Sequence, residues 1–540
     1  MITEKIKEIF PEASLIPEKF KFTSPLHQPD YLLDGKMVKW EGKRQEVFSP
    51  IYLKSEKGLE QVLLGSYPLV GENESVLALE SSVKAFNNGK GEWPTMSVEE
   101  RIKCMENFTR KMIEKRDQVV NLLMWEIGKS YKDSQKEFDR TVEYINDTID
   151  AYKDLDRDNS RFIIDSGIVA QVRRAPLGVV LCMGPFNYPL NETYTTLIPA
   201  LLTGNTVLFK PPKHGTLLHY PLLEAFATSF PKGVINTIYG RGESVVPPLM
   251  TSGKINVLTL IGSSRVADKL KKLHPKVNRL RAILGLDAKN AAIVLDNADI
   301  SLAAKECVLG SLSFNGQRCT ALKILFVHKS IVDSFIAKFN EELATLKIGM
   351  PWDENVNLTP LPEPNKPKYL KECIDDAVSK GAKIMNANGG ESNLSFVYPA
   401  VLYPINKDMK LYREEQFGPV IPIVPFESID EPINYLIESD HGQQVSLFGS
   451  DANQLADLID PLVNQVCRVN INCQCQRGPD SFPFTGRKDS AEGTLSVTDA
   501  IRAFTIRTMV AAKESPDNTL ILNKIVNEHK SKFLSTKFIF

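Results

Sequence analysis

The 540-residue sequence has no excess of charge of either sign and few cysteines. Lysine and arginine number 65 against 66 aspartate and glutamate residues, a formal net charge of −1. Such a balance creates no field that would attract nucleic acid or an anionic membrane surface, so we expect neither as a partner. The eight cysteines are scattered along the chain, unlike the dense disulfide framework of a small secreted protein.

Long hydrophobic runs are also missing. No window offers the roughly eighteen uncharged apolar residues that a membrane-spanning helix needs. The opening segment, MITEKIKEIFPEAS, lacks the continuous apolar stretch of a secretory signal. We therefore expect a cytoplasmic protein with reduced thiols. With 43% hydrophobic residues, the chain can bury several cores and should form about two to four domains.

The amino-terminal region shows only local signals. The first fifty residues look irregular, apart from a predicted hairpin around Tyr31 to Met37. Further on, Ser97-Val-Glu-Glu100 is a capping box, in which the serine hydroxyl and the glutamate carboxylate satisfy each other's free backbone amides. This motif predicts the start of an amphipathic helix.

From about residue 167, short apolar runs alternate with helical stretches, which indicates a parallel sheet covered by helices on both faces. The predicted strands are Val179 to Met183, Thr206 to Phe209, Val234 to Ile238, Val257 to Ile261 and Leu280 to Leu284. The predicted helices are 191–202, 216–230, 242–251 and 264–273. This is a Rossmann-like unit, in which a ligand binds at the carboxyl ends of the strands. Gly240-Arg-Gly242 is interpreted as a simple βα turn within it.

A second α/β series starts at Ala291-Ala-Ile-Val-Leu295 and continues through a helix to a strand at Ile324 to His328. No flexible linker separates the two series, so we expect two packed domains with a cleft between them. The predicted boundaries are 1–286 for the first domain, with an excursion near 155–175, then 287–489 for the second, and 490–540 for a final strand and tail.

Cys319 lies in the polar segment Ser-Phe-Asn-Gly-Gln-Arg-Cys-Thr-Ala, between an apolar helix and an apolar strand. A thiol at such a junction, next to Arg318, is a candidate nucleophile with a lowered pKa. A buried, inert cysteine is the ordinary alternative for any single thiol.

The longer motif FNGQRCTALK resembles the nucleophile segment of the aldehyde dehydrogenase superfamily. Four further segments resemble the same superfamily in the same order: Gly184-Pro-Phe-Asn-Tyr-Pro189, Val207-Leu-Phe-Lys-Pro-Pro212, Leu260-Ile-Gly-Ser263 and Glu415-Gln-Phe-Gly-Pro-Val420. The resemblance spans roughly residues 45 to 510. It implies an aldehyde dehydrogenase-like α/β fold with a Rossmann-like cofactor domain, a second α/β catalytic domain and a small oligomerisation strand region.

The resemblance also implies roles for single residues. Cys319 would attack an aldehyde, and Asn187 with the Cys319 amide would stabilise the oxyanion. The residues implied to bind the cofactor are Lys210, Gly262, Ser263, Glu415 and Phe417. The glycine would allow a close approach of the pyrophosphate to a helix start. The strand after residue 490 implies a homodimer or a homotetramer.

Lys213 indicates which cofactor is used. NAD-preferring members of the superfamily commonly carry an acidic residue three positions after the ribose lysine, where this sequence has Lys213. A cation there favours NADP by direct attraction to its 2′-phosphate. A solvated loop lysine is the alternative interpretation.

The expected substrate is a small-molecule aldehyde that carries a phosphate. Within the superfamily, GQRCTALK and Gln476-Arg-Gly-Pro-Asp-Ser-Phe-Pro-Phe-Thr-Gly486 most resemble the non-phosphorylating glyceraldehyde-3-phosphate dehydrogenases. Arg318 and Arg477 suit bidentate contacts to phosphate oxygens. Arg140 is a third candidate, Tyr188 is expected in the same substrate site, and structural salt bridges are the alternative role for each arginine.

The pattern breaks at the general base. Most members of the superfamily activate the hydrolytic water with a glutamate, and alignment on Lys289 places Gly285 at that position. Asp287 or another acid such as Glu415 could take over, although a strand-end turn is a common role for such an aspartate. Alternatively coenzyme A could release the thioester, as Ala288-Lys-Asn290 resembles the acylating branch, or the protein could be a non-catalytic binding scaffold.

Cys473-Gln-Cys475 carries two thiols without a nearby second pair, which makes a poor metal site. We expect no metal, and we interpret the motif as a strand with both cysteines on one face.

Overall fold

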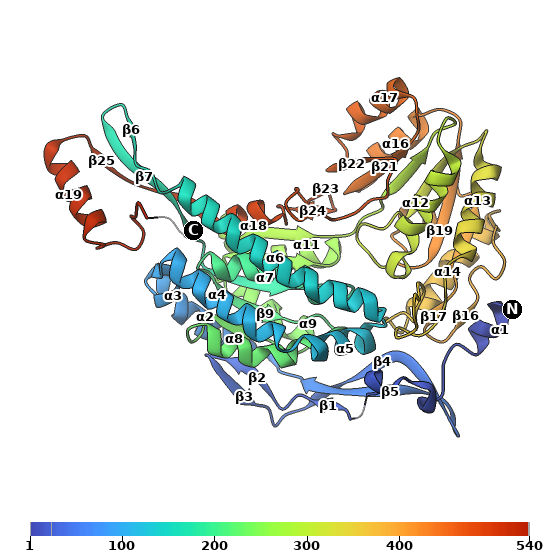
Figure 1. Cartoon of the computed structure of the whole chain (residues 1–540), viewed down its shortest axis with the longest axis horizontal. Helices are drawn as coiled ribbons and strands as arrows, with labels where there is room; N and C mark the ends of the chain where they lie inside the picture. The colour runs from blue at the N-terminus through green and yellow to red at the C-terminus, as the bar shows by residue number, and fades with distance from the viewer. Residues whose placement is uncertain (1, 23, 538–540) are drawn as a thin grey trace.

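Two lobes, each built on a largely parallel sheet, face each other, and an arm projects from one of them (Figure 1). The computed structural model describes residues 2–22 and 24–537. No helix within these ranges is long and apolar enough to cross a membrane. The fold is of the α/β class that the sequence predicted.

The first sheet has six strands in the order β10-β9-β8-β11-β12-β24. All five predicted strands occur: β8 (Val179–Met183), β9 (Thr206–Lys210), β10 (Ile235–Thr237), β11 (Val257–Ile261) and β12 (Arg281–Gly285). They pair in parallel, and the short β24 (Ala491–Glu492) joins β12 antiparallel at the edge. Their apolar runs are buried on both faces, as a helix-covered parallel sheet requires.

The helices of this lobe follow the predicted ranges, with breaks at prolines. α7 (Asn191–Leu202) and α11 (Ser264–Leu273) have the predicted ends. The range 216–230 divides into a 3₁₀ segment, Leu217–Leu222, and α8 (Leu223–Ser229). The range 242–251 divides into α9 (Gly242–Val245) and α10 (Pro247–Thr251). Proline lacks the amide that a continuous helix needs, which explains the break before Pro247.

The second sheet has seven strands in the order β15-β18-β19-β14-β13-β21-β22. The predicted strands occur as β13 (Ala291–Val294) and β14 (Ile324–His328), joined by α12 (Ile300–Leu312). The remaining strands are β15 (Lys383–Ile384), β18 (Ala400–Tyr403), β19 (Val420–Phe426), β21 (Gln444–Phe448) and β22 (Arg468–Ile471).

The amino-terminal region is more ordered than the sequence indicated. The predicted hairpin is β2 (Asp30–Leu33) with β3 (Lys36–Lys39), but a longer pair follows, β4 (Arg44–Ser55) and β5 (Gly58–Pro68). α1 (Ile2–Lys7) lies against the second lobe, where Asn393 donates to the Ile6 carbonyl at 3.0 Å.

Three long helices follow and cover the first lobe. The capping box at Ser97 and Glu100 begins α4 (Val98–Ile113), as predicted. After it come α5 (Arg116–Ile127) and α6 (Tyr131–Asp158), which runs across the lobe between the arm and the crevice.

The arm consists of β6 (Ile163–Asp165), β7 (Ile168–Pro176), β25 (Thr505–Lys513) and α19 (Pro516–Asn527) (Figure 1). Its strand order is β25-β7-β6, so β25 is an edge strand among the residues that the structure describes. Large apolar side chains on the arm are exposed, including Ile506 (47%) and Met509 (61%).

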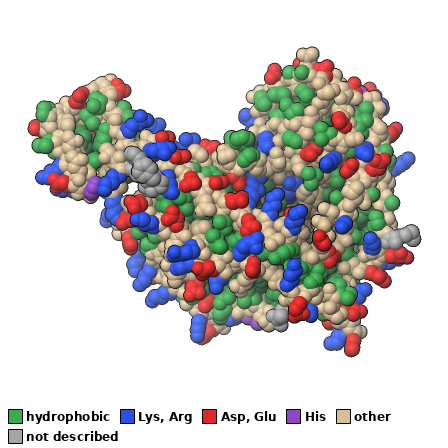
Figure 2. Space-filling view, in the orientation of Figure 1, with side chains coloured by type: hydrophobic (Ala, Val, Ile, Leu, Met, Phe, Trp, Pro, Cys, Tyr) green, Lys and Arg blue, Asp and Glu red, His purple; other side chains and the backbone are tan. Residues whose placement is uncertain are grey.

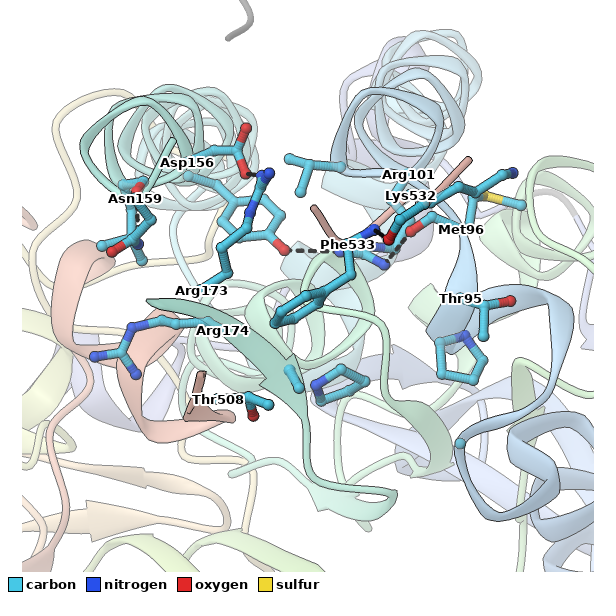
Figure 3. A pocket seen from close by; sticks show the side chains of 18 of the residues that line it. Thr95, Met96, Arg101, Asp156, Asn159, Arg173, Arg174, Thr508, Lys532 and Phe533 are labelled. Carbon is cyan, nitrogen blue, oxygen red and sulfur yellow. Dashed lines mark hydrogen bonds and ion pairs between the residues drawn. The ribbon is translucent and has the colours of Figure 1, made fainter. Parts of the chain in front are cut away.

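A cavity of ≈ 560 Å³ lies at the base of the arm, between α4, α6, β7 and β25 (Figure 3). Its guanidinium groups already have partners: Arg173 pairs with Asp156, and Arg101 donates to the Tyr152 hydroxyl at 2.8 Å. None of the predicted site residues lines this cavity. The pair of Arg173 in β7 with Asp156 in α6 therefore joins the arm to the lobe.

The interpretation of Cys473 and Cys475 as one strand face was wrong. β22 ends at Ile471, and Asn472 then adopts a left-handed conformation with φ of 51°. Cys475 is buried beside the Ser446 hydroxyl at 3.3 Å, while Cys473 is half-buried. In residues 2–22 and 24–537 no group of three or more His, Cys, Asp or Glu side chains could hold a metal ion.

Candidate functional site

Three of the predicted site residues, Asn187, Cys319 and Glu415, lie on loops that meet between the two lobes. The loop after β8 contacts the loop before β14 through a hydrogen bond of 2.8 Å from Asn187 Nδ2 to the Gln317 carbonyl. It also contacts the loop before β19, since the Phe186 and Phe417 rings lie 5.8 Å apart. Figure 2 shows Lys and Arg side chains gathered in the hollow between the lobes.

Cys319 is half-buried in the loop that joins α12 to β14. Its carbonyl oxygen accepts hydrogen bonds from Asn290 Nδ2 at 2.8 Å and from Lys323 Nζ at 3.1 Å. The thiol is therefore on a segment held from both sides, and it is not sealed in an apolar interior. Such fixed placement suits a nucleophile.

The pKa of this thiol is shifted against the prediction. Burial raises the pKa of Cys319 to about 11, and the Glu192 carboxylate adds to the rise, while Lys323 and Arg477 lower it. The expected lowering by Arg318 was wrong, because the Arg318 side chain turns back to the carbonyl of Gly310 at 3.0 Å. The free thiol is thus protonated at neutral pH.

The backbone beside the thiol is strained. Phe314 and Asn315 have φ of 49° and 55°, and Phe417 on the facing loop has φ of 46°. Side-chain-bearing residues adopt this left-handed region at a cost of about 1–3 kcal/mol each, and they concentrate at ligand and catalytic sites. The buried Asn315 side chain holds its loop by accepting from the Thr359 amide at 3.0 Å.

Asn187 is buried next to Cys319's loop, as an oxyanion residue requires, but its amide nitrogen donates to Gln317. Its own carbonyl accepts from Lys129 Nζ at 2.8 Å. Lys129 forms a fully buried ion pair with Glu137, whose other oxygen accepts from the Leu190 amide at 3.0 Å. The sequence analysis missed this pair, which fixes the loop that carries Asn187.

Two of the three predicted substrate arginines are engaged by carboxylates. Arg477 pairs with Glu192 at 2.9 Å and with Asp480 at 3.3 Å. Arg140 makes a bidentate contact with the same Asp480, at 2.8 and 3.0 Å. Arg318 has no carboxylate partner among the described residues, and its buried Nε has no hydrogen-bond partner there.

Tyr188 lies beneath the same crevice. Lys129 Nζ lies 3.6 Å from the centre of its ring, a cation–π contact, and burial raises the pKa of the phenol. The Tyr188 ring meets Phe314 edge to face, with centroids 6.0 Å apart. Tyr188 therefore connects the segment that carries Lys129 with the loop that contains Phe314 and Cys319.

Asp287 is held at the start of α11. Its carboxylate accepts from the backbone amide and the hydroxyl of Ser264, each at 2.7 Å. This is the arrangement of a helix cap, in which an acid satisfies a free amide. The geometry favours the structural role for Asp287 over water activation.

Four of the predicted cofactor residues, Lys210, Lys213, Gly262 and Ser263, lie at or just after the carboxyl ends of strands in the first sheet. Lys210 is the last residue of β9, and its only side-chain hydrogen bond within the described residues is to the Pro211 carbonyl, at 3.2 Å. Burial lowers the pKa of Lys210 to about 8. Lys213 is exposed nearby, and Gly262 and Ser263 form the turn between β11 and α11.

Glu415 faces the thiol from the second lobe. It forms an ion pair of 2.6 Å with Lys323, which is itself buried and reaches the Cys319 carbonyl. Lys323 Nζ also lies 5.4 Å from the centre of the Phe417 ring. The final lysine of FNGQRCTALK was therefore an overlooked site residue.

A match to the aldehyde dehydrogenase family covers residues 53–510, and the chain belongs to that family. The NADP-dependent glyceraldehyde-3-phosphate dehydrogenase of Streptococcus equinus is 34% identical over 451 residues, 82% of this chain and 91% of that protein. The protein of the same name from Arabidopsis thaliana is 30% identical over 91% of this chain and 98% of its own length.

Solved structures agree. The NADP-dependent glyceraldehyde-3-phosphate dehydrogenase from Bacillus halodurans C-125, complexed with NADP, superposes with a TM-score of 0.83 at 30% identity. The match covers 91% of this chain and all of that one. GapN from Methanocaldococcus jannaschii, also complexed with NADP, gives a TM-score of 0.77 at 26% identity, over 87% of this chain and all of that one.

The raised thiol pKa predicts how Cys319 reacts in the free protein. Because the thiolate is the reactive form, alkylation by iodoacetamide should accelerate with pH until about 11 instead of levelling near the ordinary cysteine value of about 8.5. Mass spectrometry of the peptide that contains Cys319 measures the rate, and half-exposed Cys104 is an internal comparison. A plateau at or below pH 8 would contradict the assignment.

Proposed function

We propose that this protein oxidises an aldehyde with NADP as the electron acceptor, and that its substrate is glyceraldehyde 3-phosphate. The single observation that carries the proposal is the half-buried thiol of Cys319 at the meeting of the two lobes, beside the Asn187 loop. The names of the relatives support both the cofactor and the substrate.

The residues present fit a dinucleotide at the first sheet. Lys210 has no side-chain partner among the described residues, so its ammonium group could donate to the hydroxyls of a ribose. Lys213 is exposed and free to meet a 2′-phosphate. NADP, when bound, supplies the acceptor for the hydride that leaves the aldehyde carbon.

The chain's own groups perform the covalent chemistry. The Cys319 sulfur bonds to the aldehyde carbon, and its proton must leave first, because the free thiol is protonated at neutral pH. The carbonyl oxygen becomes an alkoxide, to which the Cys319 amide and Asn187 Nδ2 would donate. Asn187 must then give up its bond to Gln317. Loss of hydride leaves a thioester on Cys319.

Arg318 is the strongest candidate for the substrate phosphate. Its charge is not neutralised by a carboxylate among the described residues, unlike the charges of Arg477 and Arg140. A phosphate could therefore pair with Arg318 without displacing an acidic side chain. Arg477 and Arg140 would contribute only after sharing their guanidinium groups with Asp480.

Replacing the nucleophile tests the function. The native protein with NADP and glyceraldehyde 3-phosphate should form NADPH steadily. Cys319→Ser should lower the rate of NADPH formation by at least about 1,000-fold, on the order of the loss when a nucleophile is removed. Absorbance at the NADPH band measures both an initial burst and the steady formation of NADPH. A single stoichiometric burst that only coenzyme A sustains would instead favour the acylating alternative, and unchanged turnover in Cys319→Ser would refute the role of the thiol.

Charge reversal tests the cofactor preference. Lys213→Glu should raise the KM for NADP by about 10- to 100-fold, equivalent to about 1.5–3 kcal/mol for a charge-assisted contact. The KM of the variant for NAD should then be lower than its KM for NADP. The matched control is Lys254→Glu, an exposed lysine just before β11, at the opposite end of the sheet. Equal effects of the two reversals on both cofactors would show that Lys213 does not read the phosphate.

We also propose that two copies associate through the arm. An unpaired edge strand with exposed apolar side chains is avoided in isolated proteins, because it offers backbone groups to another chain. β25 has this character, with Ile506 and Met509 exposed. Association would cover both features.

The double variant Ile506→Lys/Met509→Lys should shift the protein toward a monomer in sedimentation velocity, since two charges would then enter the apolar contact. Val378→Lys, at an exposed apolar residue of α14 (Lys366–Ser379) in the second lobe, is the control and should sediment like the native protein. A native protein that is monomeric at micromolar concentration would end the proposal.

A further inference from the structure

Glu192 is the only charged side chain in α7, a helix whose twelve residues are all buried. The residue is 6% exposed. Removing a carboxylate from water costs several kcal/mol unless it is paired, so its presence among Leu, Ile and Thr side chains calls for a role. The structure gives α7 no polar surface that would otherwise account for it.

The carboxylate is held by one oxygen. Glu192 Oε2 accepts from Arg477 Nη1 at 2.9 Å, and Arg477 is held in turn by Asp480 and by the Leu495 carbonyl at 3.3 Å. Within the described residues no hydrogen bond reaches Glu192 Oε1, although the side chain retains 8% exposure. One oxygen is thus oriented and the other remains free to accept a proton.

Glu192 also lies near the thiol. It is in the first turn of α7, directly after the loop whose Asn187 is bonded to Gln317, two residues before Cys319. Among the charged groups, Glu192 raises the pKa of Cys319 most, and its effect exceeds that of Lys323. Coulomb interactions weaken with separation, so the carboxylate is near enough for its charge to act on the sulfur.

The other acids at the site are engaged elsewhere. Gly285, where the family's glutamate is expected, has no side chain, and Asp287 caps α11 through Ser264. Glu415 belongs to the ion pair with Lys323. Glu137 uses its carboxylate on Lys129 and on the amides after Asn187. Asp287 and Glu415 also keep one oxygen without a hydrogen bond among the described residues, but Glu192 lies in the first turn after the Asn187 loop, and its charge acts on the Cys319 sulfur more strongly than that of Glu415.

We propose that Glu192 is the proton acceptor that activates the water which cleaves the acyl group from Cys319. This inference rests on the proposed function for the source of that acyl group, the thioester that aldehyde oxidation leaves on Cys319. The water oxygen bonds to the thioester carbon while one water proton moves to Glu192 Oε1. The tetrahedral oxyanion then collapses, the carbon–sulfur bond breaks, and the thiolate of Cys319 takes the proton back from Glu192. The products are a carboxylic acid and the free thiol, so no oxidant is consumed in this step.

Neighbouring charged groups influence the pKa of Glu192 and therefore whether it can accept a proton. Burial raises the pKa of Glu192 above its ordinary value, while Arg477 and Arg140 hold it down. Above that pKa the group is a carboxylate and accepts protons, so release of the acyl group should increase with pH through this ionisation. The charged and titratable groups that face Glu192 are Arg477, Arg140, Asp480, Glu137, Lys129, Tyr144 and Cys319.

Acylation by p-nitrophenyl acetate tests the inference without NADP or an aldehyde. The native protein should release one nitrophenolate per Cys319 in a burst and then turn over slowly as water removes the acetyl group. Glu192→Gln should keep the burst amplitude and lower the steady rate about 100-fold or more, the usual contribution of a general base. Glu224→Gln, the same change at an exposed glutamate in the first turn of α8, should match the native protein.

Two further measurements separate proton transfer from a structural role. Hydroxylamine, a nucleophile that needs no base, should restore release from acetylated Glu192→Gln. The steady rate of the native protein should rise with pH through one ionisation that is missing in Glu192→Gln and kept, at a lower rate, in Glu192→Asp. If circular dichroism shows that the Glu192→Gln variant is unfolded, the steady rate of Glu192→Asp and its dependence on pH are used as the test.

A steady rate of Glu192→Gln within about twofold of native would overturn the inference, because a general base contributes far more than that. So would loss of the burst and the steady phase together, or unaltered turnover in Glu192→Asp. Failure of the proposed function looks different: no NADPH forms from the aldehyde, while the ester assay still reports on Glu192.

Discussion

Charges buried around Cys319 must be paired, and this requirement shapes the whole site. Three ion pairs meet it: Lys129 with Glu137, Lys323 with Glu415, and Arg477 with Glu192. Each is largely removed from water, where an uncompensated charge would cost several kcal/mol. Since each pair joins segments from different elements, the pairing that satisfies the charges also holds the loops of both lobes around one sulfur atom. The precision of the site therefore comes from electrostatic constraint as well as from apolar packing.

Much of the fold was predictable from local patterns. Strands β8 to β14 are apolar runs that stop at polar or glycine residues, and α7 and α11 have the predicted ends because helix-forming runs are bounded by turn residues. The loop that carries Asn187 was also foreseeable, since it follows the carboxyl end of β8 in a parallel sheet, whereas the loops with Cys319 and Glu415 precede β14 and β19 and were predicted from their motifs. The cofactor residues are expected there for the same reason, and their roles remain predictions.

Other features depend on partners far away in the sequence. The raised pKa of Cys319 results from tertiary burial and from Glu192, whereas the neighbouring Arg318 turns toward the carbonyl of Gly310. The engagement of Arg140 by Asp480, 340 positions away, gives no local signal. Glu192 did give one, a single acid in an otherwise uncharged helix, but its meaning emerges only once α7 is seen to be buried. The strand assigned to Cys473 failed because the left-handed Asn472 turns the chain out of β22.

The connectivity of the arm has a consequence for biosynthesis. β25 pairs with β7 along its full length, and β24 closes the edge of the first sheet beside β12, yet both strands come after the entire second sheet in the chain. A nascent polypeptide can assemble β8 to β12 early, but it must wait until residues 491–513 leave the ribosome before either partner is available. Throughout translation of the second lobe, β7 therefore pairs with β6 alone and lacks β25, and this is the interval in which a molecular chaperone would have most to protect.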